Sequence, residues 1–388
     1  MPLKITDIRT LCLSHKHAPE DIWFSSDFRV FKADCPIIII ETDGGIQGVS
    51  EPSTYGYPPA LKERAEALKP QLLGRNPEDP SLVPENTGDH LSDICHAGIE
   101  LALWDIRGKI AGKRVADLIL DMLPGPTRAP RERLRLYASA GVQYDWDDNP
   151  ESLIDEAISL ADRGYTAYKM RLGTEWRWSG ITVERFLLLA QALTDAVGER
   201  MELMLEGNAR LDEEQALQIG RWLDERAWTW FEEPLAKDQL EGYARLNKAL
   251  AIPITGGESN TRLADFEPFF AKKAFAKGQL DVGMCTLREA IRIYCRGRDY
   301  GIPVFAQNWH NGLLTVANAH FLAALPEAHV LEQFVGQGPL QWSILRERPI
   351  ADGYFNLPAG PGWGVSLAPN LAQKFPWIPG SWGEREAR

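Results

Sequence analysis

Three glutamates recur at equal intervals in the middle of the chain. Glu206, Glu232 and Glu258 follow one another at steps of 26 residues, each at the end of a short β-rich run. One such step is the length of a strand, a helix and their connections, so the three side chains are expected to converge. Converging carboxylates repel one another unless a cation lies between them. Because Mg²⁺ prefers oxygen ligands, the spacing predicts one Mg²⁺ on these glutamates.

The elements that would position these residues form a repeating pattern. From Leu134 onward, β-rich runs alternate with amphipathic stretches of helical period. The eight runs are LRLYASAG, TAYKMRLG, MELMLEGN, WTWFEEP, IPITGGES, QLDVGM, IPVFAQN and AHVLEQF. This alternation is typical of a TIM-like parallel (β/α) barrel, where chemistry sits at the C-terminal strand ends. An open doubly wound sheet would need a glycine-rich turn after an early strand, which the sequence lacks.

The N-terminal part of the chain has a different pattern. Two apolar stretches flank Asp43-Gly44-Gly45, which is typical of an antiparallel hairpin, and two helical stretches follow. A segment rich in Pro, Gly and Arg, residues 123–133, then marks a boundary. We therefore predict an α+β capping domain, a barrel, and a tail that packs back on the cap. These cover residues 1–128, 129–349 and 350–388, respectively.

The composition restricts the class of protein. The 388 residues are 44% hydrophobic and 25% charged, as expected for a globular protein of two domains. The net charge is −12 and no run of Lys and Arg is present, so nucleic acid is not an expected partner. The five cysteines are scattered, and neither a signal peptide nor a membrane-spanning run is evident. We therefore expect reduced thiols, a cytoplasmic location and no membrane partner.

Several short motifs in a fixed order resemble those of a known family. They are ALWDIRGK, YKMRLG, LEGN, FEEP, GGES, GIPV and PGWGV. On these motifs the chain resembles the mandelate racemase subgroup of the enolase superfamily over nearly its whole length. The resemblance implies a capping domain on a (β/α)7β barrel, assembly as a homo-oligomer, and Mg²⁺ on Glu206, Glu232 and Glu258, although position 206 is more often Asp. It also implies abstraction of the proton alpha to a carboxylate, through a metal-stabilised enediolate.

The residues expected to move protons depart from the family pattern. Where the family has Lys-x-Lys, this chain has Lys169-Met-Arg171. Arginine keeps its proton in nearly all settings, so we expect Arg171 to bind the substrate carboxylate or a hydroxyl, and Lys169 to be either a second positive clamp or the base. The family's His–Asp dyad falls on Gln307 and Asp281. Because Gln cannot carry a proton, His310 is the alternative acid or base, with Asp281 orienting it.

These departures favour one-sided chemistry over racemisation, which needs a base on each face. We expect dehydration of a sugar acid to a 2-keto-3-deoxy acid, with Glu332 as an acid that hydrogen-bonds the substrate carboxylate. The alternatives are a cycloisomerase or epimerase of a sugar acid or lactone, and a catalytically silent metal-binding homologue. Loops 17–28 and 174–180 are expected either to cover a polyol substrate or to pin themselves to the barrel rim. The predicted substrate contacts are Asn208, Gln307, Trp176 and Trp309.

Overall fold

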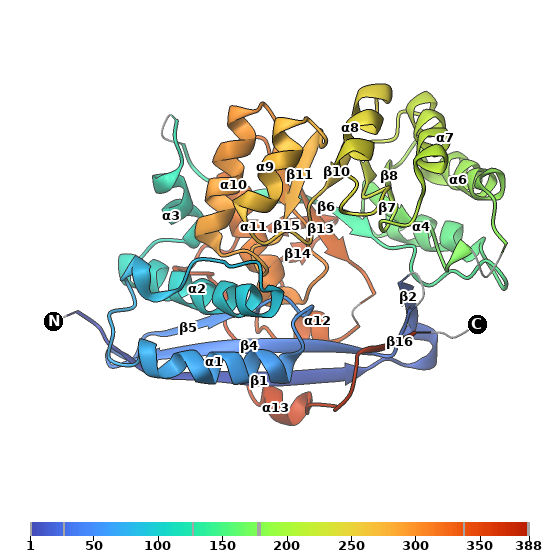
Figure 1. The fold of residues 1–388 in the computed structure, drawn as a ribbon. Coiled ribbons are helices and arrows are strands. Elements are labelled where there is room, and N and C mark those ends of the chain that lie inside the picture. Colours follow the sequence, from blue (N-terminus) through green and yellow to red (C-terminus); the bar gives the residue numbers. More distant parts are fainter. Residues whose placement is uncertain (1, 26–27, 126–127, 177–179, 337, 386–388) are drawn as a thin grey trace.

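The computed structural model describes residues 2–25, 28–125, 128–176, 180–336 and 338–385. It has two lobes (Figure 1). A layer of long N-terminal strands with helices α1 and α2 lies beneath a barrel formed by the middle of the chain. Helix α2 lies between the strands of the lower layer and the barrel helices, so that the capping lobe faces the barrel along one side.

The capping lobe is an antiparallel sheet with two helices on one face. Strands β1 (Ile5–Lys16), β4 (Lys32–Thr42) and β5 (Gln47–Ser50) pair in that order. The turn between β4 and β5 places Gly45 at φ 74°, a left-handed conformation that glycine adopts without strain. Helices α1 (Pro58–Leu72) and α2 (His90–Ala111) bury their apolar faces against the isoleucines of β1 and β4. The predicted hairpin and both predicted helices are therefore confirmed.

The barrel strands coincide with the eight predicted runs. Parallel pairing joins β6 through β12 in chain order, and β13 pairs with β6. The strands are β6 (Arg133–Ser139), β7 (Ala167–Arg171), β8 (Glu202–Glu206), β9 (Phe231–Glu232), β10 (Ile254–Gly256), β11 (Lys277–Leu280), β12 (Val304–Ala306) and β13 (Val330–Phe334). The predicted barrel with an N-terminal cap is confirmed.

Helices follow the strands and cover the outside of the barrel. Their buried faces carry Leu, Ile, Val, Ala and Phe, and pack against the strands. They are α4 (Ser152–Asp162), α6 (Val183–Val197), α7 (Glu213–Glu225), α8 (Leu240–Ala249), α9 (Leu263–Ala271), α10 (Leu287–Asp299) and α11 (Gly312–Ala324). Helix α3 (Val115–Met122) leads from the cap to the barrel. Short helices α12 (Leu340–Ser343) and α13 (Leu371–Lys374) lie in the C-terminal part.

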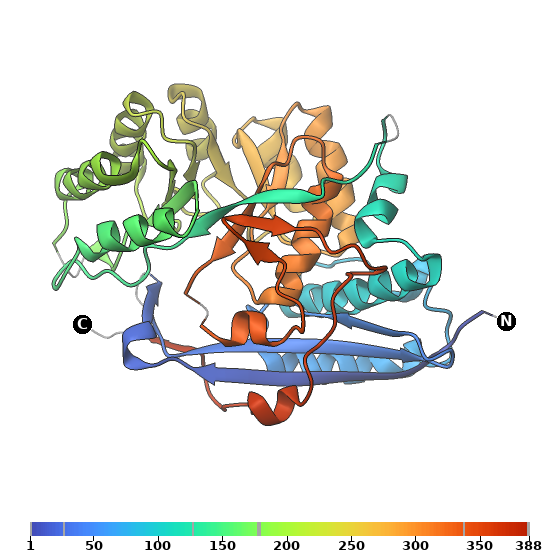
Figure 2. The same ribbon diagram turned by 180° about the vertical axis from the view of Figure 1, so that it is seen from behind.

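The C-terminal tail corrects one expectation. Residues from 350 were predicted to pack on the cap, but β14 (Ile350–Ala351) and β15 (Tyr354–Asn356) form a hairpin beside β6 (Figure 2). The first half of β6 precedes the point where β7 begins to pair, so its backbone groups are free to bond β15. Beyond this hairpin the tail does reach the cap, where the Trp363 indole N–H donates to the carbonyl of Val49 at 2.9 Å.

The last strand of the tail also joins the cap. β16 (Gly383–Arg385) pairs antiparallel with β3 (Phe28–Val30), which pairs with β2 (Trp23–Ser25). These three short strands form a second small sheet. The end of the chain is therefore held at the edge of the capping lobe that faces the barrel, as Figure 1 shows for β2 and β16.

All five cysteines are free thiols, as their scatter predicted. Burial raises the pKa of the Cys95 thiol to about 12, so this side chain stays protonated in the core of the cap. Within the described ranges, no helix combines the length and the apolar composition that crossing a bilayer would require.

Candidate active site

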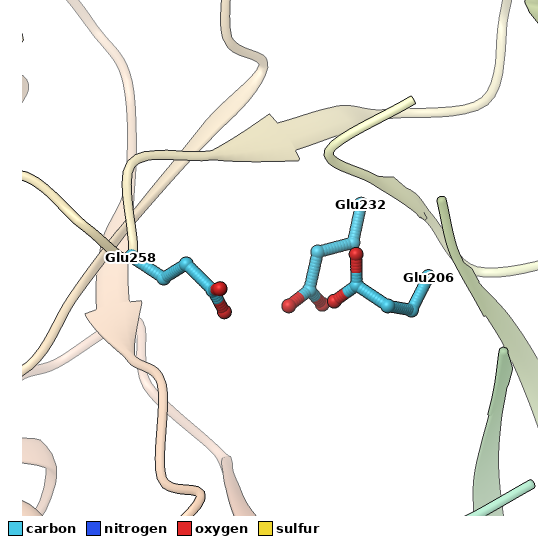
Figure 3. A group of neighbouring side chains, drawn as sticks. All are labelled: Glu206, Glu232 and Glu258. Atoms are coloured by element: carbon cyan, nitrogen blue, oxygen red, sulfur yellow. The ribbon is translucent and has the colours of Figure 1, made fainter. Parts of the chain in front are cut away.

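The three equally spaced glutamates meet at the barrel mouth. Glu206 and Glu232 are the last residues of β8 and β9, and Glu258 lies just after β10. One carboxylate oxygen from each lies within 4.8 Å of those of the other two. Figure 3 shows the three side chains pointing toward one another. The convergence predicted from the 26-residue spacing is therefore present.

The cluster has the donor set and the charge deficit of a cation site. Glu206 Oε1 accepts a hydrogen bond from the backbone N–H of Asn208 at 2.7 Å, but its buried Oε2 has no hydrogen-bond donor in the described part of the chain. Burial and the neighbouring Glu232 raise the pKa of Glu206 well above its usual range. An all-oxygen set short of positive charge suits a hard divalent cation such as Mg²⁺.

Lys169 lies beneath this cluster and is fully enclosed. Its Nζ lies 2.8 Å from Glu232, 2.9 Å from Glu332 and 3.7 Å from Glu206. Burial alone would lower the pKa of Lys169, but the three carboxylates outweigh burial and raise the pKa above its ordinary value. Conversely, Lys169 outweighs the burial of Glu232 and lowers the pKa of that carboxyl to about 2. Of the two roles left open for Lys169, the geometry favours the positive clamp over the base.

Arg171 is the last residue of the same strand, and its side chain lies on the same face of β7 as that of Lys169, two residues earlier. Its guanidinium lies 3.9 Å from the ring centroid of Trp309, and no ion pair joins it to a carboxylate among the described residues. Trp309 in turn stacks on Phe334, with ring centroids 3.4 Å apart. Arg171 is therefore a fixed cation that is free to bind an anionic or hydroxyl group of a ligand.

On the other side of the mouth, Asp281 and His310 form a buried pair. His310 Nε2 lies 2.7 Å from Asp281 Oδ2, and both side chains are fully enclosed. Asp281 Oδ1 also accepts the N–H of Gly283, which fixes the carboxylate. Burial lowers the pKa of His310, but Asp281 and further carboxylates outweigh that effect and raise it. His310 Nδ1 has no hydrogen-bond partner within the residues that the structure places.

The carboxylate of Glu332 contacts two other residues of the barrel. Its Oε1 pairs with Lys169, and its Oε2 accepts the backbone N–H of Asn308 at 2.7 Å. Asn308 also donates through Nδ2 to the Glu332 carbonyl at 2.8 Å. These bonds bridge β12 and β13, which share no backbone pairing in the described ranges. Glu332 Oε1 has this ion pair but no hydrogen-bond donor in the described part of the chain, so its contact with the substrate stays a prediction.

A cavity of about 300 Å³ lies between the barrel mouth and the cap. From the barrel it is lined by Arg171, Asn208, Lys237, Glu258 and Trp309. The cap and the tail supply much of the remaining wall, which includes Trp23, Lys32, Asp34, Tyr55 and Trp382. One carboxylate of the cluster, Glu258, and the guanidinium of Arg171 thus line the same cavity.

The predicted substrate contacts divide into two groups. Asn208 and Trp309 line the cavity. Gln307 is buried, with an Oε1 that has no partner in the described part of the chain, and it is not among the cavity-lining residues. Trp176 is a correction, because its indole N–H donates to the Leu172 carbonyl at 2.8 Å and its ring packs on Phe186.

The two predicted covering loops also differ. Loop 17–28 supplies Trp23 to the cavity wall, while its residues 26 and 27 lie outside the described residues. Loop 174–180 has its first residues packed on the barrel, and 177–179 lie outside the described residues. Sequence reasoning missed Lys32 and Asp34 as wall residues. Their signal was available, since two charged residues alternate at the start of an otherwise buried strand.

Comparison with known proteins agrees with this architecture. Residues 7–119 match the family model of the mandelate racemase/muconate lactonizing enzyme N-terminal domain. Residues 152–371 match the enolase C-terminal domain-like model. The chain belongs to the mandelate racemase subgroup of the enolase superfamily. The predicted resemblance is thereby confirmed, and this member of the superfamily keeps both of its characteristic domains.

Relatives of this superfamily member include enzymes of sugar acid metabolism. It is 28% identical to a D-galactarolactone cycloisomerase of Agrobacterium fabrum, over 96% of this chain and 99% of the relative. It is 27% identical to an arabinonate dehydratase of Saccharolobus solfataricus, again over 96% and 99%.

Solved structures show the same fold. A 3,6-anhydro-D-galactonate cycloisomerase of Zobellia galactanivorans superposes with a TM-score of 0.81 at 24% identity, covering 96% of this chain and 99% of that one. A muconate lactonizing enzyme of Pseudomonas fluorescens gives a TM-score of 0.82 at 22% identity, covering 97% and 100%. At this level of identity, the structures establish the architecture of the chain and not its reaction.

Proposed function

We propose that this protein is a Mg²⁺-dependent lyase that removes the proton alpha to the carboxylate of a sugar acid and expels the β-hydroxyl, giving a 2-keto-3-deoxy acid. One observation carries the proposal. A single His–Asp pair with a free ring nitrogen lies on one side of the carboxylate cluster, whereas the other side presents an arginine and a fully paired lysine. Such a site can move a proton on one face only.

Glu206, Glu232 and Glu258 would hold the Mg²⁺, since Glu206 Oε2 accepts no hydrogen bond and the three carboxylates outnumber the two lysines, Lys169 and Lys237, that pair with them. Bound there, Mg²⁺ supplies electrostatic stabilisation for the negative charge that develops on the substrate carboxylate during proton removal. Lys169 fixes two of the surrounding carboxylates and reduces their mutual repulsion. Arg171, which stays protonated, binds a carboxylate or hydroxyl oxygen of the substrate in the cavity.

His310 is the proposed base. Because Nε2–H donates a hydrogen bond to the Asp281 carboxylate, the lone pair of the neutral imidazole lies on Nδ1, which is the nitrogen without a partner. His310 is buried and is not among the cavity-lining residues. Tyr55, a cavity residue that is 41% exposed, lies edge-on to the imidazole with ring centroids 5.9 Å apart, so the proposal requires Tyr55 to move aside when a substrate enters. A raised pKa strengthens the imidazole as a base at neutral pH.

The elimination then balances with one catalytic group. The α proton passes to His310 Nδ1, and the C–H electron pair forms the carbon–carbon double bond as the β C–O bond breaks. The protonated imidazole returns a proton to the departing hydroxyl, which leaves as water. The resulting enol tautomerises to the 2-keto acid. No second base is needed, which agrees with the arginine at position 171.

A second candidate is cycloisomerisation of a sugar acid lactone. The relative from Agrobacterium fabrum bears the name of such an enzyme, and it is similar over 96% of this chain. When a lactone oxygen occupies the β position, the leaving group is a carboxylate and needs no proton. The same base on one face would therefore serve both reactions.

We also propose that the enzyme acts in the cytoplasm on small molecules and assembles as a homo-oligomer. Five free thiols and a net charge of −12 support a reducing compartment and a partner other than nucleic acid.

The test is a panel of aldonic acids, aldaric acids and their lactones, incubated with the protein and Mg²⁺ and assayed for 2-keto products by NMR. We expect a keto acid from at least one acid, which requires Mg²⁺ and is lost in Glu232→Gln together with Mg²⁺ binding. Products from lactones alone would favour cycloisomerisation. Failure of every acid and lactone, with Mg²⁺ still bound, would favour a catalytically silent metal-binding homologue.

A further inference from the structure

The end of the chain forms part of the cavity wall. Trp382 lines the cavity beside Trp23 and Val30 of the cap. Its carbonyl accepts the backbone N–H of Phe31 at 3.0 Å, and the residues that follow it form β16, which pairs with β3. Because β3 also pairs with β2, the tail is one strand of a sheet that supplies Trp23 and Val30 to the cavity wall. Trp382 is therefore held in place by backbone bonds of its own carbonyl and of the strand that follows it.

A row of aromatic rings leads from this residue to the barrel. The ring of Trp382 stacks on Trp23, with centroids 6.1 Å apart and planes inclined by 25°. Trp23 packs edge-on against Trp309 at 5.5 Å and Phe334 at 5.3 Å. Trp309 carries the guanidinium of Arg171 at 3.9 Å. The wall thus runs from the C-terminal tail, across the cap, to the cation proposed to bind the substrate.

The rings in this row differ in how far the protein covers them. Trp23 and Trp309 are 5% and 6% exposed, whereas Trp382 is only partly buried at the cavity. The indole N–H of Trp23 is buried, and no acceptor for it lies within the described residues. A buried donor without an acceptor is costly, so an ordered water oxygen is expected to complete it.

We propose that Trp382 is a specificity residue that, with Trp23, packs against the carbon chain of the substrate beyond its reacting end. This inference rests on the proposed sugar acid function. Aromatic faces suit the C–H groups of a polyol chain. The carboxylate end lies at Arg171 and the glutamate cluster, so only an acid long enough to extend along the row gains from Trp382.

Isothermal titration calorimetry with Mg²⁺ present tests this length dependence. The probes are the six-carbon acids gluconate, galactonate and mannonate, and the three-carbon acid glycerate. We expect Trp382→Ala to weaken binding of the best six-carbon acid about tenfold, or about 1.4 kcal/mol. Binding of glycerate should stay within about twofold, a change below about 0.5 kcal/mol. Trp382→Phe keeps a ring and should lose less affinity than the alanine variant.

The matched control is Glu384→Gln, which changes an exposed side chain on the same terminal strand. It should bind both classes of acid as the wild type does. Equal weakening of both classes by Trp382→Ala, or no weakening of either, would overturn the role of Trp382 while leaving keto acid formation intact. If the wild type neither binds nor converts any acid, the proposed function fails, and this inference fails with it.

Discussion

Lys169 and His310 are both enclosed at the mouth of the same barrel, but their surroundings differ. Lys169 meets three carboxylates, two of them within 2.9 Å, and is in effect a structural cation. His310 meets one carboxylate through Nε2 and keeps Nδ1 unpaired in the described part of the chain. The number of fixed partners, rather than burial, therefore separates a positive clamp from a candidate base.

The comparison also shows why the two strand ends are not interchangeable. At the end of β7, the only other basic residue is Arg171, whose guanidinium stays protonated and rests on Trp309. Neither basic side chain of β7 accepts a proton as readily as an imidazole does, because the guanidinium stays protonated and Lys169 is held by carboxylates. The asymmetry supports elimination on one face, and the variants below test each side in turn.

The largest effect is expected on the dyad side. His310→Asn keeps a polar side chain of similar size but removes the base, and kcat should fall about 1,000-fold. Steady-state kinetics on the acid identified by the panel measures this loss. His329→Asn, which changes an exposed histidine, is the control and should keep wild-type activity. A His310 variant with normal kcat would remove the base from the account.

On the Lys169 side of the mouth, the main effect is expected on the stability of the fold. Lys169→Met leaves Glu232 and Glu332 buried without their cation, so the free energy of unfolding should fall by about 3 kcal/mol. Urea denaturation measures the change. Lys113→Met removes an exposed ion pair with Asp121 and should leave stability nearly unchanged. Equal stability of the Lys169 variant and the wild type would show that the three contacts are not the clamp described.

Arg171 distinguishes substrate binding from proton transfer on the β7 side. Arg171→Met should lower kcat/KM about 100-fold, because a charged hydrogen bond to the substrate is lost. Arg171→Lys keeps the charge but loses the planar contact, so its kcat/KM should lie between those of Arg171→Met and the wild type. The fold should persist in both, by circular dichroism. A lysine variant more active than the wild type would contradict the binding role.

The pH dependence sharpens the contrast further. His310 must be neutral to accept a proton, and Asp281 holds its pKa above the ordinary value of 6.5. The acid limb of kcat/KM should therefore lie above pH 6.5 in the wild type. In Asp281→Asn, burial acts with less opposition and the limb should move down by about one pH unit. If the acid limb does not move in Asp281→Asn, the limb reports the titration of a group other than His310.

Periodicity made much of this site predictable from the sequence. The 26-residue step places Glu206, Glu232 and Glu258 at successive strand ends, and parallel strands bring such residues together whatever the intervening helices contain. The pairing of His310 with Asp281 could be proposed because both follow strands at one end of the barrel. Its free Nδ1 required coordinates, since a sequence does not show which ring nitrogen is bonded.

Other features depended on contacts between distant segments. Trp176 was expected to contact the substrate, but its indole N–H donates to the Leu172 carbonyl and its ring packs on Phe186. The hairpin β14–β15 pairs with β6 because β7 leaves half of that strand uncovered, which strand patterns do not reveal. Trp382 reaches the cavity only because β16 pairs with β3.

The measurement that tests one-sided chemistry most directly is the reaction of the identified sugar acid in D₂O with Mg²⁺, followed by NMR of the unreacted acid. With a base on one face only, the recovered substrate should keep its original configuration at the α carbon while 2-keto-3-deoxy acid accumulates. Recovery of the α epimer carrying deuterium would reveal a second base and contradict the account.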